Sequence, residues 1–321
     1  MQVNFCRETL WRPDSPWWQR APFCPAAPLR RGTVLAARGD TPPRYLLPSV
    51  LPSSIPGSHF ARNLVDRRTL LFQLVRRDFT QRYAGSAAGW LWSLIHPLVL
   101  LASYTFIFSV CLKQPAGSGE LTRSYPLFLF AGMLPWLLFS DTVSRSGTSI
   151  VEHANLVTKT MFPSEIVPVS IFLSSAASHL PTVLLFIAVV AITQGHANAM
   201  VVLLPAYLLF LGMFAVGVGW IVAALQVYLR DTAQVVSVVL TFWMWITPLF
   251  IDEKRYDAAG VGLAVRANPL AYLVRAYRVM LLGSTRPSFR DLAAIAAAGG
   301  AAFLIGGMFF RRMKKGFADV L

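Results

Sequence analysis

Charged side chains are scarce in this sequence. They make up 14% of its 321 residues, and the acidic ones are the rarer kind, with 15 Asp and Glu against 29 Lys and Arg. Soluble domains carry about 25% charged residues, so a chain that is 55% hydrophobic does not fit the ordinary soluble enzymes and binding domains. We therefore expect a polytopic membrane protein. The net charge of +14 fits the anionic inner surface of a bilayer.

Three kinds of chemical site are also missing from the sequence. The cysteines, Cys6, Cys24 and Cys111, lie far apart without a C-x-x-C pair, which argues against a metal site or a disulfide framework. No G-x-x-x-x-G-K-[ST] motif occurs, so the chain has no P-loop for ATP. His96 and His179 have no second ligand at helical spacing and are interpreted as packing residues rather than as a metal site or a proton relay.

Six apolar segments have the roughly 20 residues that a membrane-spanning helix needs. Only the second contains an acidic residue, Asp141, close to its end. Proton- or sodium-coupled carriers need ionisable groups within their spans, so we expect the energy for any transport to come from a separate ATPase. The predicted fold is all-α with six transmembrane helices, at 87–112, 126–144, 166–193, 199–229, 232–251 and 292–310.

The ends of the chain differ from this transmembrane domain, which we place at 84–311. Residues 1–60 hold ten of the 21 prolines and show no apolar period, so they are predicted to be a disordered tail without a signal peptide. Residues 312–321 form a short basic tail, which we interpret as an anchor to the inner membrane surface rather than as a nucleic-acid patch. No nucleic-acid partner is expected.

Two stretches outside the spans are predicted to be amphipathic helices. In 61–83, apolar residues share a narrow sector, which indicates a helix along the inner membrane surface or simply a basic lipid anchor. A hinge at Gly85–Gly89 would join it to the first span, with Trp90 and Trp92 at the level of the headgroups. The stretch NPLAYLVRAYRVMLLG, between spans five and six, predicts an interfacial or re-entrant helix whose stripe excludes Arg275 and Arg278.

The distribution of Lys and Arg predicts the orientation. Six arginines precede the first span and four cationic residues follow the sixth, so both termini are expected in the cytoplasm of a bacterial cell, with the protein in the inner membrane. The loop 252–291 is the exception, because it carries seven Lys and Arg although this topology places it outside.

The stretch LLFQLVRRDFTQRYAGSAAGWLWSLIHPLVLLASYTFIFSV resembles the first segment of the membrane subunit of type-2 ABC exporters that move O-antigen, capsular or teichoic-acid glycans. NLVTKTMFPSEIVPVS is similar to the cytoplasmic coupling segment of that family, and the resemblance continues through YLRDTAQVV, TPLF and RRMKKGFADVL, over about residues 62–321. It implies a homodimer with its pore at the dimer interface, two ATPase subunits that hold ATP and Mg²⁺, and a lipid-linked glycan as substrate. No cofactor is expected in this chain.

The resemblance assigns roles to three groups of residues. In the coupling segment, residues 150–164, the ATPase would be contacted by Glu152, Asn155, Leu156, Lys159, Phe162 and Pro163, although an ordinary surface loop is the alternative from the residues alone. Aromatic side chains suit the C–H faces of sugars, so the channel candidates are Tyr104, Phe108, Trp136, Phe139, Trp243 and Trp245, with helix packing as the alternative. The surface helix would gate access through Phe72, Arg76, Phe79, Arg82 and Tyr83.

Two other functions remain open. A type-2 ABC exporter of a drug, haem or a lipid would share this topology. A membrane-embedded transferase would need clustered carboxylates, and the acidic group of Asp252, Glu253 and Asp257 is the one candidate cluster. Lys254 and Arg255 lie within it, which favours charge pairing in a solvated loop over catalysis.

Overall fold

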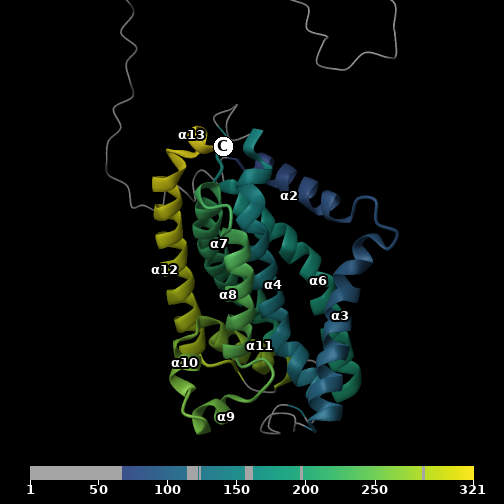
Figure 1. The fold of residues 1–321 in the computed structure, drawn as a ribbon. Coiled ribbons are helices and arrows are strands. Elements are labelled where there is room, and N and C mark those ends of the chain that lie inside the picture. Colours follow the sequence, from purple (N-terminus) through teal and green to yellow (C-terminus); the bar gives the residue numbers. More distant parts are fainter. Residues whose placement is uncertain (1–66, 114–121, 123, 156–161, 196–197, 284–285) are drawn as a thin grey trace, which may run out of the picture. The chain divides into compact units, whose positions relative to one another are not determined.

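The computed structural model describes residues 67–113, 122, 124–155, 162–195, 198–283 and 286–321, and within these ranges it is helical throughout, without strands (Figure 1). Contacts divide the chain into Met1–Pro52 and Ser53–Leu321, and every described residue belongs to the second unit. The predicted disordered tail, residues 1–60, lies outside the described residues. The elements are α2 (Arg68–Tyr83), η2 (Gly89–Leu91), α3 (Trp92–Thr105), η3 (Phe106–Cys111), α4 (Tyr125–Glu152), α6 (Ile166–Gln194), η4 (Ala199–Leu203), α7 (Leu204–Tyr228), α8 (Thr232–Ile246), α9 (Glu253–Ala258), α10 (Gly262–Ala267), α11 (Pro269–Leu282), α12 (Phe289–Lys314) and α13 (Phe317–Val320).

Five helical stretches are long and apolar enough to cross a bilayer, and they correspond to predicted segments one to four and six: Gly89–Cys111, Tyr125–Glu152, Ile166–Gln194, Ala199–Tyr228 and Phe289–Lys314. The fifth predicted segment, 232–251, is helical only over the 15 residues of α8. At 1.5 Å per residue this helix is about 22 Å long, less than the roughly 30 Å of a bilayer core. It ends because Thr247 precedes Pro248 and is extended (ψ 133°), as the proline ring requires.

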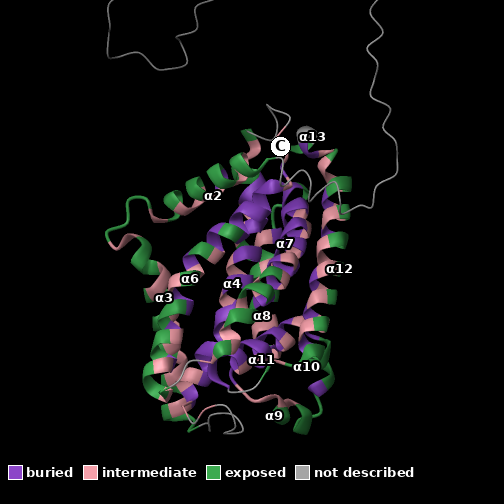
Figure 2. Ribbon diagram, turned by 180° about the vertical axis from the view of Figure 1, so that it is seen from behind, coloured by how far each residue is buried: buried purple, intermediate pink, exposed green. Residues whose placement is uncertain are grey.

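The centre of the bundle is formed by α4 and α7, where buried residues concentrate (Figure 2). Helices α6 and α12 pack on either side of this pair. Where α7 and α12 meet, a side chain at Gly217 or Gly306 would collide with the backbone of the other helix. These glycines therefore allow the close approach of the two helices.

The hinge predicted between the surface helix and the first span is confirmed. Helix α2 ends at Tyr83, the chain turns through Gly85 (φ 75°) and Gly89 (φ 52°), and α3 begins at Trp92. Both glycines have left-handed backbone angles that other residues adopt at a cost. Helix α3 then runs along the edge of the bundle without a single buried residue.

Two ends of the bundle can be distinguished in Figure 1. Helix α2 and α13 lie at one end, which we call the α2 end. The short helices α9 and α10 lie with α11 at the opposite end, which we call the α11 end. The apolar stripe predicted for α11 exists, and its residues Leu270, Leu273, Val274, Tyr277 and Leu281 are all buried against the protein.

Candidate functional site

The predicted coupling segment is described at its two ends only. Glu152 and Asn155 are exposed where α4 finishes, and Phe162 and Pro163 are half-buried just before α6. Leu156 and Lys159 lie outside the described residues. The exposed side chains leave the end of α4 accessible to a partner.

The residue that follows the coupling segment, Glu165, is held from two helices. Its carboxylate accepts a hydrogen bond from Lys314 Nζ of α12 at 2.9 Å, and its main-chain carbonyl accepts one from Trp220 Nε1 of α7 at 3.0 Å. The C-terminal tail is attached beside it, because Tyr228 Oη donates to the carbonyl of Met313 (2.7 Å). Sequence reasoning missed these contacts, which join the start of α6 to α7 and α12.

The predicted gate helix, α2, packs against the protein through the face that carries Leu74. Phe72 is 68% exposed, and Leu74 is the buried residue of the helix. Phe79 and Tyr83 are half-buried and make an edge-to-face ring contact at 5.3 Å, while Arg76 is exposed. Phe72 points away from the protein, and its role at the gate stays a prediction.

Two ion pairs attach α2 to α4. Arg82 donates to both carboxylate oxygens of Asp141 at 3.0 Å, and Arg145 donates to both oxygens of Asp78 at 2.6 and 2.7 Å. Ser175 of α6 connects the pairs, since it accepts a hydrogen bond from Arg145 (3.1 Å) and donates one to Asp141 (2.6 Å). The pair between Asp78 and Arg145 was not predicted from the sequence, because the two residues are 67 positions apart.

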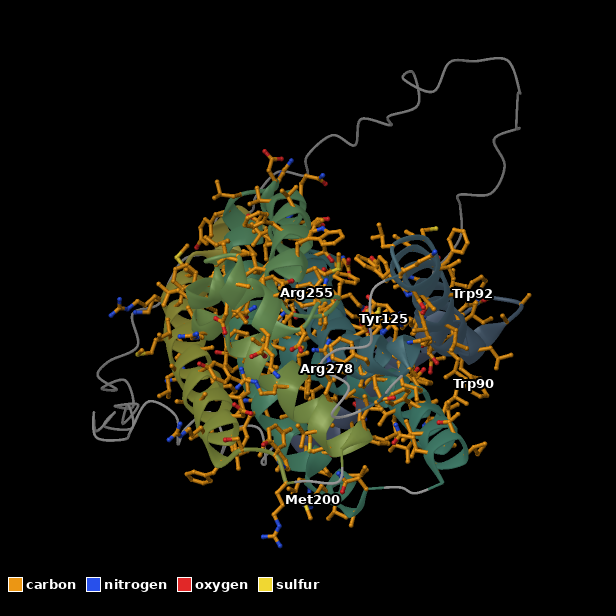
Figure 3. All side chains as sticks on the ribbon, turned by 90° about the horizontal axis from the view of Figure 1, so that it is seen from below. Trp90, Trp92, Tyr125, Met200, Arg255 and Arg278 are labelled. Carbon is orange, nitrogen blue, oxygen red and sulfur yellow. The ribbon has the colours of Figure 1, made fainter. Side chains whose placement is uncertain are left out.

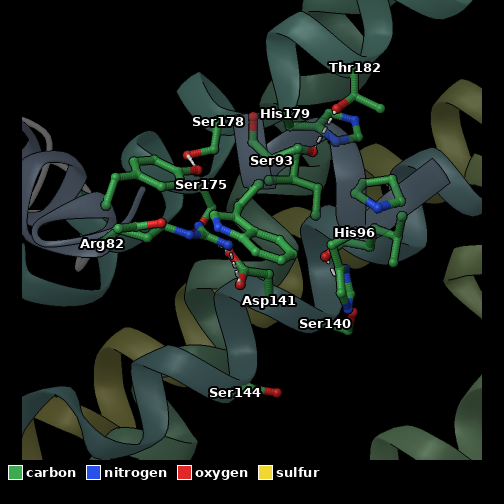
Figure 4. A pocket seen from close by; sticks show the side chains of 16 residues that line it. Arg82, Ser93, His96, Ser140, Asp141, Ser144, Ser175, Ser178, His179 and Thr182 are labelled. Carbon is green, nitrogen blue, oxygen red and sulfur yellow. Dashed lines mark hydrogen bonds and ion pairs between the residues drawn. The ribbon is translucent and has the colours of Figure 1, made fainter. Parts of the chain in front are cut away.

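A cavity of about 600 Å³ lies beside these ion pairs, between α2, α3, α4 and α6 (Figure 4). We call it the α2 cavity. Arg82 and Asp141 form part of its wall, and Ser178 accepts a hydrogen bond from Tyr83 Oη at 3.1 Å. On the α3 side, the carbonyl of Ser93 accepts a hydrogen bond from Thr182 Oγ1 (3.1 Å). His96 and His179, interpreted from the sequence as packing residues, both line this cavity.

The channel candidates fall into two aromatic groups. Near the α11 end, Tyr104 and Phe108 of the first span contact the ring of Phe250 at 4.9 and 5.0 Å, and Trp245 meets the same ring at 5.0 Å. Trp245 is 51% exposed, whereas Phe108 is buried. This group is therefore accessible on one side of the chain.

The second aromatic group lies deeper. Phe139 is fully buried between Phe214 (5.4 Å) and Trp243 (5.3 Å), and Trp136 packs beside it at 5.9 Å. Trp243 Nε1 donates to Asn268 Oδ1 at 3.0 Å. Phe139 and Trp136 are thus buried within the single chain and do not line an open space there.

The α11 end contains a buried arginine that the sequence placed off the packing stripe. Arg278 donates to the carbonyls of Phe128 (3.2 Å) and Leu249 (2.6 Å), and its guanidinium carbon lies 3.7 Å from the centre of the Phe128 ring. Gly132 makes room, because a Cβ there would lie 2.8 Å from an Arg278 nitrogen. Burial lowers the pKa of Arg278 to about 10, so the side chain stays charged at neutral pH.

Two other basic residues of this end are also paired. Arg275 bonds Glu253 at 2.6 Å and Asp291 at 2.8 Å, and Arg266 bonds Asp257 at 2.8 Å. Figure 3 shows Arg278 and Tyr125 toward the middle of this view, whereas Trp90 and Trp92 project at the edge. Three of the seven cationic residues of 252–291, Arg266, Arg275 and Arg278, are therefore held by partners within the protein. Among the described residues, no group of His, Cys, Asp and Glu could hold a metal ion.

Residues 69–282, from the start of α2 to the end of α11, match the ABC-2 type transporter family. The chain belongs to this family. This ABC-2 type transporter is 29% identical to the O-antigen export system permease protein RfbA of Myxococcus xanthus over 260 residues, which are 80% of this chain and 97% of that protein. It is 25% identical to the RfbA permease of Klebsiella pneumoniae over 255 residues, 78% and 95% of the two chains. The predicted membership of the type-2 ABC exporters is confirmed.

Proposed function

We propose that this chain is the permease subunit of an ATP-driven exporter of O-antigen or a related surface polysaccharide across the bacterial inner membrane. One observation carries the proposal: the similarity to O-antigen export permeases extends over 95–97% of their length. It therefore includes the spans, the surface helix and the coupling segment together. A lipid-linked glycan is the proposed cargo.

The energy would come from a separate ATPase subunit that carries ATP and Mg²⁺. The absence of a P-loop motif supports this division of labour. The exposed end of α4, with Glu152 and Asn155, offers an accessible contact surface, and the attachment of Glu165 to α7 and α12 would carry a push from the ATPase into the bundle. The proposed contact residues are those predicted: Glu152, Asn155, Leu156, Lys159, Phe162 and Pro163.

We further propose that two copies of the chain enclose the pore, with α8 as the fifth of six spans in each copy and both termini in the cytoplasm. Helix α8 presents an apolar stripe at helical spacing, with Val235, Val238, Phe242 and Trp245 each more than half exposed. A second copy of the chain would cover this stripe. Lipid would cover it less well, because an isolated helix of this length is shorter than the bilayer core. Two of the seven cationic residues of 252–291 are held within the protein, Arg275 by its acidic partners and Arg278 by burial, and the orientation rests on the cationic residues beside the first and last spans.

Within that pore, Tyr104, Phe108 and Trp245 would contact the glycan, with Trp136, Phe139 and Trp243 behind them. Aromatic faces suit the C–H surfaces of sugar rings while the hydroxyls stay hydrated. Helix α2, through Arg76, Phe79, Arg82 and Tyr83 together with the outward-facing Phe72, would control access from the inner leaflet. The ion pairs that attach α2 to α4 are partly exposed, which supports a helix that can move.

Deletion of the gene tests the proposal. Surface polysaccharide should disappear while lipid-linked glycan accumulates on the inner side, and the wild-type gene should restore export. A variant with alanine at Asn155, Lys159 and Phe162 should fail to restore export and should co-purify with less ATPase, whereas Arg286→Ala, at the α11 end, should behave as wild type. Unchanged surface polysaccharide after deletion would refute glycan export and favour a drug, haem or lipid as cargo.

A further inference from the structure

The α2 cavity has the size of a ligand site. Its volume of about 600 Å³ falls in the range of roughly 300–1,000 Å³ that is typical of small-molecule pockets. It lies within one chain, between α2 and the three spans α3, α4 and α6, and no residue of α8 lines it (Figure 4). Neither the channel residues nor the coupling segment contribute to its wall.

The charges of the wall are matched. Arg82 is the cationic residue of the lining and Asp141 the acidic one, and they bond each other through two contacts of 3.0 Å. Behind them, Arg145 is bound to Asp78 in the same bidentate manner. A diphosphate or another anion would have to break one of these pairs to gain a cationic partner. The cavity therefore favours an uncharged ligand.

Several polar groups of the wall have no partner. The hydroxyls of Ser86 and Ser144, the indole N–H of Trp92 and the ring nitrogens of His96 make no hydrogen bond with any residue that the structure describes, and the same is true of the buried Nε2 of His179. Only the His179 nitrogen is buried, where a polar group without a partner costs free energy, whereas Ser86, Trp92, His96 and Ser144 are exposed and their polar groups are open to a ligand or to water. These groups come from the connection between α2 and α3 and from α3, α4 and α6, so they are spread around the cavity. The hydroxyl groups around a sugar ring would require such a spread.

The wall also offers an apolar surface. The ring of Trp92 is half exposed at the cavity, and Pro97, Leu137 and Leu138 complete this side. An aromatic face beside dispersed donors and acceptors matches the two-sided chemistry of a sugar, which presents C–H groups on its faces and hydroxyls at its edge. A phospholipid headgroup, in contrast, carries a phosphate for which this cavity has no free cation.

We propose that the α2 cavity binds one uncharged sugar residue of the glycan, on the side of the membrane where α2 lies. This inference rests on the proposed glycan export. Arg82 and Asp141 would offer adjacent donors and acceptors to neighbouring hydroxyls, and Trp92 would cover one face of the ring. A site outside the pore that holds a sugar would retain the glycan next to the gate helix before it is moved.

Photo-crosslinking in the glycan-producing cell tests occupancy directly. The photoreactive residue p-benzoylphenylalanine is placed at Ser144 and, as a control, at Thr193, an exposed position of α6 away from the cavity. After irradiation, the intact permease–ATPase complex is purified and the permease band is stained for glycan with periodate and a hydrazide dye, while cells grown with ³²P-phosphate report lipid phosphate. We expect a glycan-stained ladder from Ser144 and none from Thr193.

Two results would overturn the inference. A ³²P-labelled band of nearly unchanged size, without the ladder, would assign the cavity to a phospholipid headgroup. The absence of any adduct at Ser144 would mean that the cavity holds water alone. In either case, loss of surface glycan on gene deletion would show that the proposed function stands and that only the sugar site has failed.

A second measurement follows the rate of export. Ser144→Leu places a bulky apolar side chain in the cavity and should slow export at least about fivefold, the effect of losing about 1 kcal/mol of binding, whereas Ser144→Ala should stay near wild type. Thr193→Leu controls for the added bulk, and recovery of the permease–ATPase complex with normal ATP hydrolysis controls for folding. Export at the wild-type rate by Ser144→Leu would contradict the proposal independently of the crosslink.

Discussion

The two ends of the bundle use the same chemistry, an arginine bound to oxygen acceptors, in different surroundings. At the α11 end Arg278 is 5% exposed and its acceptors are main-chain carbonyls. At the α2 end Arg82 and Asp141 each keep 29% of their side-chain surface exposed and lie beside a cavity. Breaking the contacts of Arg278 leaves buried groups without partners, whereas water can take the place of either partner in the pair of Arg82 and Asp141.

This difference indicates which part of the molecule can move. The α11 end joins α4, the turn after α8 and α11 through Arg278, and Asn268 adds a bond to Thr247 at 2.9 Å. The α2 end holds its surface helix mainly through polar contacts, and Leu74 is the buried apolar residue of that helix. Segments with few buried apolar contacts open at low free-energy cost. We expect α2 to move while the α11 end stays fixed.

Removal of the Arg278 charge should produce the largest effect. Arg278→Met leaves the carbonyl of Leu249 without its donor, whereas the carbonyl of Phe128 keeps its hydrogen bond within α4. Because a buried acceptor without a partner costs about 1–3 kcal/mol, stability should fall by about 1–3 kcal/mol. Thermal unfolding of the purified complex in detergent measures the loss. Arg290→Met, at an exposed position of α12, is the control. Equal unfolding temperatures for the two variants would contradict a fixed α11 end.

A charge exchange at the α2 end should have a smaller effect on stability. Arg82→Asp places a carboxylate against Asp141 and should release α2, at a cost of about 1 kcal/mol or less because the pair is partly exposed. Amide hydrogen exchange within 68–83 should become faster, and the double variant Arg82→Asp with Asp141→Arg should restore slow exchange. If Arg82→Asp destabilised the whole protein as much as Arg278→Met, the two ends would not differ in the way described.

Much of the fold is predictable from the sequence because long apolar runs leave little choice in a membrane protein. Five of the six segments, the glycine hinge and the stripe of α11 follow from local patterns. The length of α8 could have been read from Thr247 and Pro248, since a residue before proline leaves the helical region. The proline marks the end of the helix, but apolar residues continue beyond it, so the predicted segment was longer than α8.

The contacts that define the two ends could not be predicted in the same way. Arg278 binds a carbonyl 150 residues earlier in the chain, and the space for it comes from Gly132. Helix α2 contains two apolar sectors, one with Phe72 and one with Leu71 and Leu74. Both suit a helix at a membrane surface, so only packing against α6 decides which is buried.

The smallest expected effect concerns transmission between the ATPase and the bundle. Lys314→Met removes the ion pair to Glu165 but leaves the hydrogen bond from Trp220. Because a partly exposed pair contributes about 0.2–1 kcal/mol, export should fall by at most about fivefold while ATP hydrolysis stays unchanged, which is the signature of weaker coupling. Lys315→Met, one residue further and exposed, is the matched control, and export per ATP hydrolysed by the purified complex in vesicles is the measurement. A parallel fall of hydrolysis and export would instead indicate that the ATPase contact itself is lost, and then Glu165 would not transmit the movement of the coupling segment to α12.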